Sequence, residues 1–162
     1  MVWSQEFDGP AGTLPDTTST WNHDIGTGPD GWGNQEHEYY TDTNATCDGN
    51  GNLVIKAERV PADDPNAASD PRVEFYSSRI HTKGKVAFKY GRIEARIKMP
   101  KGAGAWPALW MLGTQIGDVA WPDSVSYTHL RIVAKSTLSK SAILKMNLLR
   151  VCMDLFTSAT NH

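Results

Sequence analysis

The last quarter of this chain lacks residues that the rest of it uses freely. Among the 162 residues no glutamate follows Glu94, and residues 124–162 contain no glycine, proline or tryptophan. An ordinary stretch of that length would hold roughly five glycines and prolines. The same stretch has a net charge of +4, whereas residues 1–123 have a net charge of −6. We therefore expect the chain to change character near residue 124.

Cysteine is scarce and long apolar runs are absent. Cys47 and Cys152 are the only cysteines, which excludes a disulfide framework and favours two free thiols. No apolar run approaches the roughly 20 residues of a membrane-spanning helix. Met1 leads directly into a strand-like segment, so no signal peptide is visible. The net charge of −2 indicates neither a nucleic-acid nor a membrane partner.

Alternating polarity predicts strands in the first three quarters. Residues 92–98 alternate polar and apolar side chains, which is the period of a half-buried strand. Residues 53–57 and 76–82 are also predicted strands, and residues 106–112 form an apolar run typical of a buried one. Short strands separated by turn residues predict an all-β antiparallel sandwich. Residues 61–71 are rich in proline and aspartate, and we expect a surface loop there.

The apolar residues of the tail recur with a different period from those of the predicted strands. Leu144, Leu148, Val151 and Leu155 recur at helical spacing, which predicts a helix over about residues 136–156. A basic amphipathic helix can bind a membrane. A segment without a selected role is the interpretation that we favour.

One motif identifies a family. The sequence GWGNQE at residues 31–36, followed by YYT at 39–41, resembles glycoside hydrolase family 16 in its laminarinase branch, the endo-1,3-β-glucanases. Four further blocks stand in the family's order, and they are WSQEFDG at 3–9, DGNGNLVIKA at 48–57, YSSRIHTKGK at 76–85 and YGRIEARIKMPKGAGAWPALWMLG at 90–113. The resemblance covers residues 1–123. It implies a β-jelly-roll sandwich of the concanavalin A type, a cleft that binds β-glucan, secretion and a monomeric state.

The catalytic motif of that family is not found. The resemblance places E-x-D-x-x-E just after Trp121 and Pro122, with the first glutamate as nucleophile and the last as acid/base. Alternate residues of a strand share a face, and a bulge can re-aim the last one. Retaining hydrolysis needs two carboxyl groups about 5–5.5 Å apart. Residues 123–128 read DSVSYT and offer one carboxylate, so we predict that this chain is inactive.

The break in composition has a candidate explanation. Residues 125–131, VSYTHLR, resemble an in-frame translation of an adapter used to prepare sequencing libraries. This favours the hypothesis that residues 124–162 are an artefact. The chain would then consist of a truncated sandwich at 1–123 and a non-homologous tail at 124–162, and we expect the tail to pack poorly on the sandwich.

Five residues are candidates for glucan binding. Sugar rings have flat C–H faces edged by hydroxyl groups, so a glucan cleft needs aromatic platforms and a few directed hydrogen bonds. Trp106, Trp110 and Trp121 suit the platforms, although tryptophans in an apolar strand are more often core. Asn34 and Arg79 suit the hydrogen bonds, with an Asx-turn and a surface charge as the alternatives. The resemblance favours the cleft role for Trp106, Trp110 and Arg79.

None of the remaining acidic and histidine residues is predicted to be catalytic. Glu36 and Glu38 flank a histidine but lie outside the catalytic motif, and we interpret them as structural. The histidines lack the spacing of a zinc site. The resemblance implies no required cofactor and a structural calcium ion, for which Glu6 and Gly9 are the candidate ligands, although the partner near the family's C-terminus is absent.

Two functions remain open. The first is the N-terminal part of a retaining endo-β-1,3(4)-glucanase. The second is a β-glucan-binding module that lost catalysis and kept the cleft. A purely structural role has no positive support in the sequence.

Overall fold

The chain folds as a sandwich of short β-strands with one short α-helix. This computed structural model describes residues 3–61, 63–87, 93–100, 104–112, 132–136 and 150–157. The elements in chain order are β1 Asn22–Asp24, β2 Glu38–Tyr40, β3 Ala45–Cys47, β4 Leu53–Ile55, β5 Glu58–Arg59, α1 Pro65–Ser69, β6 Phe75–Ser77, β7 Arg79–His81, β8 Ile93–Ile97, β9 Ala105–Leu112, β10 Ile132–Ser136 and β11 Arg150–Thr157. In these ranges no helix has the length and apolarity needed to cross a membrane.

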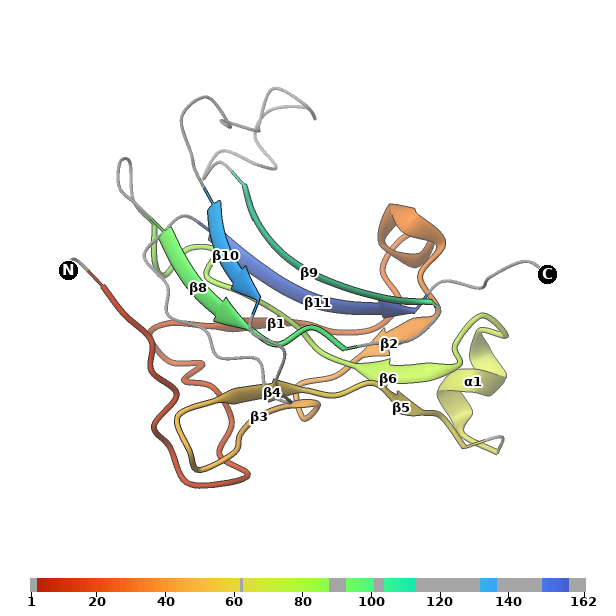
Figure 1. Ribbon diagram of the computed structural model, residues 1–162. Helices are drawn as coiled ribbons and strands as arrows, with labels where there is room; N and C mark the ends of the chain where they lie inside the picture. Colours follow the sequence, from red (N-terminus) through yellow and green to blue (C-terminus); the bar gives the residue numbers. More distant parts are fainter. Residues whose placement is uncertain are drawn as a thin grey trace.

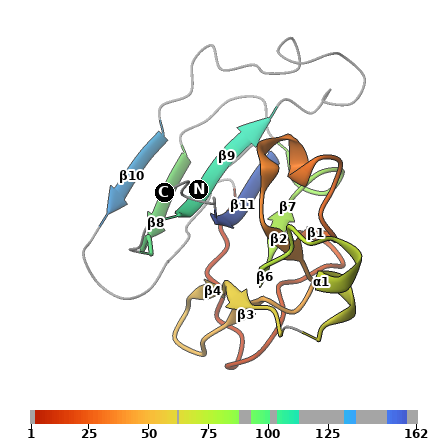
Figure 2. The same ribbon diagram turned by 90° about the vertical axis from the view of Figure 1, so that its right-hand side faces the viewer.

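The strands form two layers (Figure 1). One layer holds the sheet of order β1-β7-β11-β9 together with the pair β10-β8, and the pair β3-β4 lies across from it. The third sheet has the order β2-β6-β5 and continues from the first through the chain, because β6 and β7 are separated only by Ser78. Figure 2 shows β8 and β10 on one flank of the molecule and β2, β6 and α1 on the other. The predicted sandwich is confirmed. The prediction that its strands pair antiparallel is wrong for two pairs, because β2 pairs parallel with β6 and β10 pairs parallel with β8.

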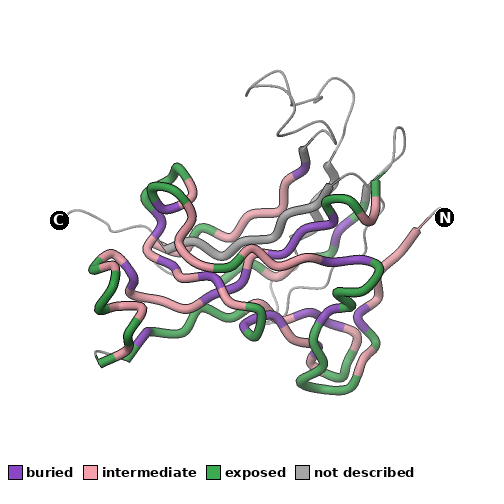
Figure 3. The backbone as a smooth tube through the Cα atoms, turned by 180° about the vertical axis from the view of Figure 1, so that it is seen from behind, coloured by how far each residue is buried: buried purple, intermediate pink, exposed green. Residues whose placement is uncertain are grey.

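The core lies between the two layers. Ile80 of β7, Ala95 of β8, Met111 of β9 and Leu53 of β4 are buried and belong to one hydrophobic cluster. Figure 3 shows buried stretches of backbone in both layers.

Aromatic residues from before β1 close one end of the core. Trp21 is fully buried, stacks on Phe7 with ring centroids 6.0 Å apart, and meets the edge of Trp3 at 6.5 Å. Such contacts stabilise the fold beyond the burial of apolar area. The N-terminal segment is therefore part of the sandwich.

Strand β9 separates the core from the opposite face of the sheet. Met111 is in the core cluster and Leu109 packs against it. Alternate residues of a strand point to opposite faces, which places Trp106, Ala108 and Trp110 on the other face. This strand and β8 confirm the strands predicted at residues 106–112 and 92–98. The expectation of a buried strand at 106–112 is wrong, because Met111 is the one buried residue among residues 106–111 and Trp106 is 55% exposed.

One surface segment differs from its prediction. The expected loop at residues 61–71 contains helix α1. Asp64 caps this helix, because its carboxylate accepts a hydrogen bond of 2.9 Å from the backbone N–H of Asn66, and Pro65 occupies the first turn. Both features favour helix initiation, so the same proline and aspartate that suggested a loop start a short helix.

The tail prediction is wrong where the structure describes the tail. Strand β11 pairs antiparallel with β9 from Arg150 opposite Leu112 to Thr157 opposite Ala105, and it also pairs with β7. Strand β10 pairs parallel with β8. Residues 150–156 are therefore strand, not helix, and both segments join the sheet instead of packing poorly on it.

The physical reason lies in the edges of β7 and β9. Unpaired backbone groups at a sheet edge favour any segment that can pair with them. Residues 150–157, RVCMDLFT, include β-branched and aromatic residues that are favoured in strands. The backbone hydrogen bonds that β11 forms along β9 outweigh the preference for a helix that the leucine spacing indicates. The rest of the predicted helix lies outside the described residues.

Candidate glucan-binding site

Arg79 is the centre of a buried charged cluster. The register of β1 and β7 places Asp24 opposite Arg79, and Arg79 Nε lies 3.0 Å from Asp24 Oδ2. The second oxygen of Asp24 lies 3.3 Å from Nε2 of His81. On its other side Arg79 Nη1 lies 3.9 Å from Oε1 of Glu36. The Arg79 side chain is only 11% exposed, so these carboxylates compensate a charge that water barely reaches.

Two indole rings flank the guanidinium group. It lies 4.7 Å from the ring centroid of Trp32 and 5.3 Å from that of Trp110. Contacts of this kind between a cation and an aromatic face are attractive and hold both partners in place. Trp106, four residues before Trp110 on β9, is 55% exposed. The face of the sheet opposite the core therefore carries a fixed arginine beside an accessible tryptophan.

The turn before β2 positions Trp32 and Asn34. This turn, Gly31–Gln35, contains left-handed backbone at Trp32 and at Gly33. Gly31 also has a positive φ of 55°, and a Cβ atom there would stand 2.5 Å from the backbone nitrogen of Glu36. A Cβ on Gly28 would stand 2.4 Å from the Trp32 ring. Only glycine fits at these two positions, which explains why the motif around Trp32 is rich in glycine.

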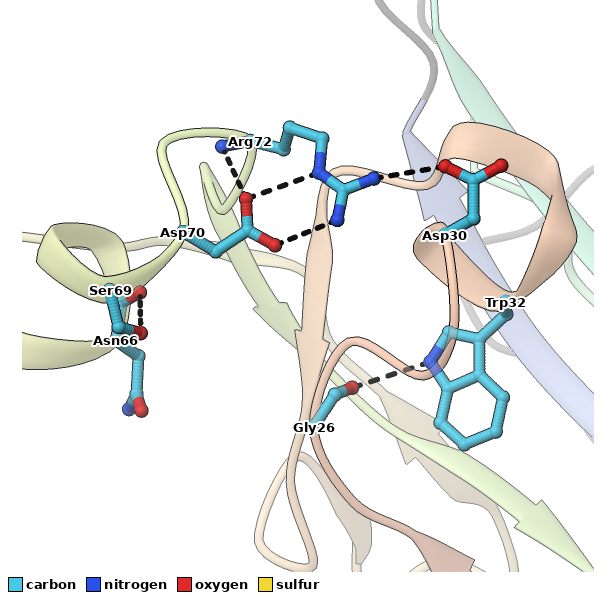
Figure 4. Close-up of polar contacts among 7 residues, drawn as sticks. All are labelled: Gly26, Asp30, Trp32, Asn66, Ser69, Asp70 and Arg72. Atoms are coloured by element: carbon cyan, nitrogen blue, oxygen red, sulfur yellow. Dashed lines mark hydrogen bonds and ion pairs between the residues drawn. The ribbon is translucent and has the colours of Figure 1, made fainter.

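Contacts outside the turn hold it from two directions (Figure 4). Trp32 Nε1 donates a hydrogen bond of 3.3 Å to the carbonyl oxygen of Gly26. Arg72 pairs with Asp70 at 3.0 Å and reaches across to Asp30, with 3.3 Å between Nη1 and Oδ1. Asp30 is the residue just before the turn, so Arg72 links the end of the α1 segment to it.

Glu36 lies beneath the turn and is almost completely buried. Its Oε1 accepts a hydrogen bond of 2.9 Å from Nδ2 of Asn34, and its Oε2 accepts one of 2.7 Å from the hydroxyl of Tyr40. Burial raises the pKa of Glu36 above the ordinary glutamate value, and the hydrogen bonds from Asn34 and Tyr40 and the charge of Arg79 oppose that rise. Every contact described here is to a group that favours the carboxylate form.

Four of the five predicted binding residues lie in one part of the fold. Arg79, Trp110 and Trp106 share a face of the first sheet, and Glu36 connects Arg79 to Asn34. The fifth residue, Trp121, lies outside the described residues, as do positions 123–128, where the resemblance places the catalytic motif. The binding roles of all five residues stay predictions.

Sequence reasoning missed two residues of this cluster. Asp24 was not singled out, although the polar strand Asn22–Asp24 is the antiparallel neighbour of β7. Trp32 belongs to the family motif but was not assigned a role. Its position between Tyr40, 6.0 Å away between ring centroids, and Arg79 makes it part of the site. Asp24 and Arg79 were each visible as charged residues in predicted or polar segments, but their pairing depends on the register of β1 against β7.

The implied calcium site gains no support from the described residues. Calcium takes six to eight oxygen ligands. Across the described ranges no group of three or more His, Cys, Asp or Glu side chains could hold a metal ion. Glu6 and Gly9 alone do not supply such a set, and calcium binding stays a prediction from the resemblance.

Comparison with known proteins agrees with this geometry. The family profile of glycosyl hydrolases family 16 matches residues 33–125, which contain the second half of the turn, Arg79 and strand β9. The chain belongs to this family. It is 41% identical over 129 residues to the β-glucanase of Rhodothermus marinus, covering 76% of this chain and 40% of that protein.

Solved structures of the family have the same fold. The laminarinase catalytic domain of Thermotoga maritima MSB8 superposes with a TM-score of 0.65 at 46% identity, covering 76% of this chain and 47% of that one. A β-1,3-glucan-binding protein of Penaeus monodon is 48% identical over 48 residues, covering 30% of this chain and 13% of that protein. The chain thus spans less than half the length of the relatives it matches.

Proposed function

We propose that this chain is the N-terminal part of an endo-β-1,3(4)-glucanase and that it contributes the β-glucan-binding half of the cleft. The proposal rests on the aromatic and charged side chains on the face of the first sheet that points away from the core. There the exposed ring of Trp106 lies on the same strand face as Trp110, whose ring meets the buried guanidinium of Arg79 at 5.3 Å. An open aromatic face beside fixed polar groups suits a sugar ring.

Hydrolysis is proposed for the longer protein and not for this chain. A retaining mechanism requires a nucleophilic carboxylate and an acid/base carboxyl close to each other. No glutamate follows Glu94 in the sequence, and Glu36 is engaged by Asn34 and Tyr40. The binding residues would hold the glucan while the catalytic pair, absent from residues 123–128, would cleave it.

An assay of laminarin hydrolysis tests this proposal. The purified 162-residue chain is incubated with laminarin and with a mixed β-1,3/1,4-glucan, and new reducing ends are counted against buffer and against an active laminarinase. We expect the count to equal the buffer blank with both polymers. Release of reducing ends above that blank would show that the chain has a catalytic pair that the sequence does not predict.

A non-catalytic β-glucan-binding module is the second candidate. The similarity to the glucan-binding protein of Penaeus monodon favours it. Both candidates predict laminarin binding without hydrolysis. A cooperative thermal melt of a soluble chain would support a stable module, whereas aggregation of the chain would support a truncated enzyme.

Three further properties are proposed on the resemblance alone. They are secretion, a monomeric state and a structural calcium ion held in part by Glu6 and Gly9. Thermal melting with calcium and with a chelator tests the last of these.

A further inference from the structure

Side chains from three separate segments contact the carboxylate of Glu36. Asn34 belongs to the turn before β2, Tyr40 to β2 and Arg79 to β7. The Glu36 side chain is 2% exposed, so these contacts are screened little by water. A carboxylate placed in this way can transmit the position of one segment to the next.

One oxygen of Glu36 contacts both Asn34 and Arg79, the two residues predicted to hydrogen-bond the sugar. Oε1 accepts the hydrogen bond from Asn34 Nδ2 at 2.9 Å, and the same atom lies 3.9 Å from Arg79 Nη1. The other oxygen is held by the Tyr40 hydroxyl at 2.7 Å. The Tyr40 bond therefore fixes the plane of the carboxylate, and the carboxylate fixes the distance between Asn34 and Arg79.

The chemistry of a carboxylate also decides how the Asn34 amide is turned. An ionised carboxylate only accepts hydrogen bonds, so the NH₂ of Asn34 must face it and the amide oxygen must face away. Asn34 is itself exposed. It would therefore offer an acceptor to a ligand, whereas Arg79 can only donate. A sugar hydroxyl is both donor and acceptor, and two neighbouring hydroxyl groups can use one of each.

We propose that Glu36 is a positioning residue that orients the Asn34 amide as a hydrogen-bond acceptor and places it beside the Arg79 donor, so that both groups engage one glucan segment. The proposal rests on the proposed glucan-binding function. It assigns Glu36 no part in bond cleavage, because its oxygens already contact Asn34, Tyr40 and Arg79.

The test compares Glu36→Gln with a matched control elsewhere in the fold. Glu58 on β5 also accepts a hydrogen bond of 2.9 Å from an asparagine amide, that of Asn44, and it belongs to a different sheet from Arg79. Calorimetric titration with laminarihexaose measures affinity. We expect Glu36→Gln to weaken binding about tenfold, since a hydrogen bond to a charged group is lost, and Glu58→Gln to bind like the wild type.

A second readout does not depend on sugar. In the free protein, two-dimensional NMR resolves the side-chain amide of Asn34 and the Nε–H of Arg79. We expect a distinct, well-dispersed Asn34 amide signal in the wild type and in Glu58→Gln. In Glu36→Gln that signal should move toward the position of an unstructured side chain, because a glutamine can present either its oxygen or its NH₂ group. The Nε–H of Arg79 lies against Asp24 and serves as the internal control for folding.

The outcomes distinguish a failure of the positioning role of Glu36 from a failure of the proposed glucan-binding function. Wild-type affinity in Glu36→Gln, or an unchanged Asn34 amide signal in it, overturns the positioning role and leaves the proposed function standing. If the wild type does not bind the hexaose, the proposed function fails, and the NMR signals alone decide on the positioning role.

If Glu36→Gln does not fold, Tyr40→Phe takes its place. It should weaken binding about threefold and broaden the Asn34 signals, and a wild-type result on both counts overturns the proposal.

Discussion

Two arginines of this fold are each placed between two carboxylates, and their surroundings differ. Arg79 pairs with Asp24 and faces Glu36, with its side chain 11% exposed and two indole rings against it. Arg72 pairs with Asp70 and Asp30, with its side chain 42% exposed and Asp30 74% exposed. The charge pattern is the same, but only the first cluster is shielded from water and salt.

The difference shows how burial changes the role of an ion pair. Exposed pairs contribute little to stability because water and salt screen them. A buried pair costs desolvation when it forms, and removing one partner leaves an uncompensated charge. We infer that the Arg79 cluster is a fixed part of the binding face, whereas Arg72 only steadies the turn from outside.

Removing the buried arginine should have the largest effect. Arg79→Leu leaves Asp24 and Glu36 without their shared cation, and we expect a loss of about 3 kcal/mol in the free energy of unfolding. Urea denaturation measures it, with Arg72→Leu as the matched control on the exposed cluster. Equal losses in the two variants would contradict the distinction between the clusters.

Removing the exposed platform should affect binding more than stability. Trp106 is 55% exposed, so Trp106→Ala should cost less stability than the loss of a fully buried side chain. We expect the affinity for laminarihexaose to fall about tenfold with a thermal melt that stays cooperative. A variant that binds normally would remove Trp106 from the site, and a variant that melts much earlier would place it in the core.

The pH dependence of stability should separate Glu36 from exposed carboxylates. Burial raises the pKa of Glu36, so the folded state holds this proton more tightly than the unfolded state. The resulting stabilisation is complete below the usual glutamate pKa of about 4.3 and is lost as the pH rises through the raised value. Tyr40 and Arg79 are the titratable groups that contact Glu36 directly.

Denaturation of the wild type and Glu36→Gln from about pH 4 to about pH 7 measures this effect. We expect the stability of the wild type relative to the variant to fall across that range. A difference that does not change with pH would show that Glu36 titrates normally.

Breaking the exposed cluster should have the smallest effect. Arg72→Ala removes the link from Asp70 to Asp30 at the start of the turn. We expect the melting temperature to change by no more than about 2 °C, and added salt to abolish the change, because exposed pairs are screened. A large, salt-independent loss would mean that Arg72 is part of the buried framework.

Local patterns predicted the strands well. The two-residue period predicted β8, which has Ala95 in the core. The apolar run at residues 106–112 is β9, and the predicted strand at 76–82 contains Arg79. These predictions succeeded because alternation along a strand is a local property of the backbone.

Features that depend on distant segments were not predictable in this way. The helical spacing of the leucines did not reveal that Arg150–Thr157 would pair with β9 and β7, because that outcome depends on edges built from other parts of the chain. The role of Asp24 likewise requires the register of β1 against β7. Helix α1 is an intermediate case, since its cap and its proline were visible and were assigned to a loop.

A calorimetric titration of the purified chain with laminarihexaose tests the proposed glucan binding most directly. We expect saturable binding with a dissociation constant of about 1 mM or tighter, because the aromatic and polar groups of the proposed binding face are in place without the catalytic pair. A chain that is folded and shows no saturable heat of binding would contradict it.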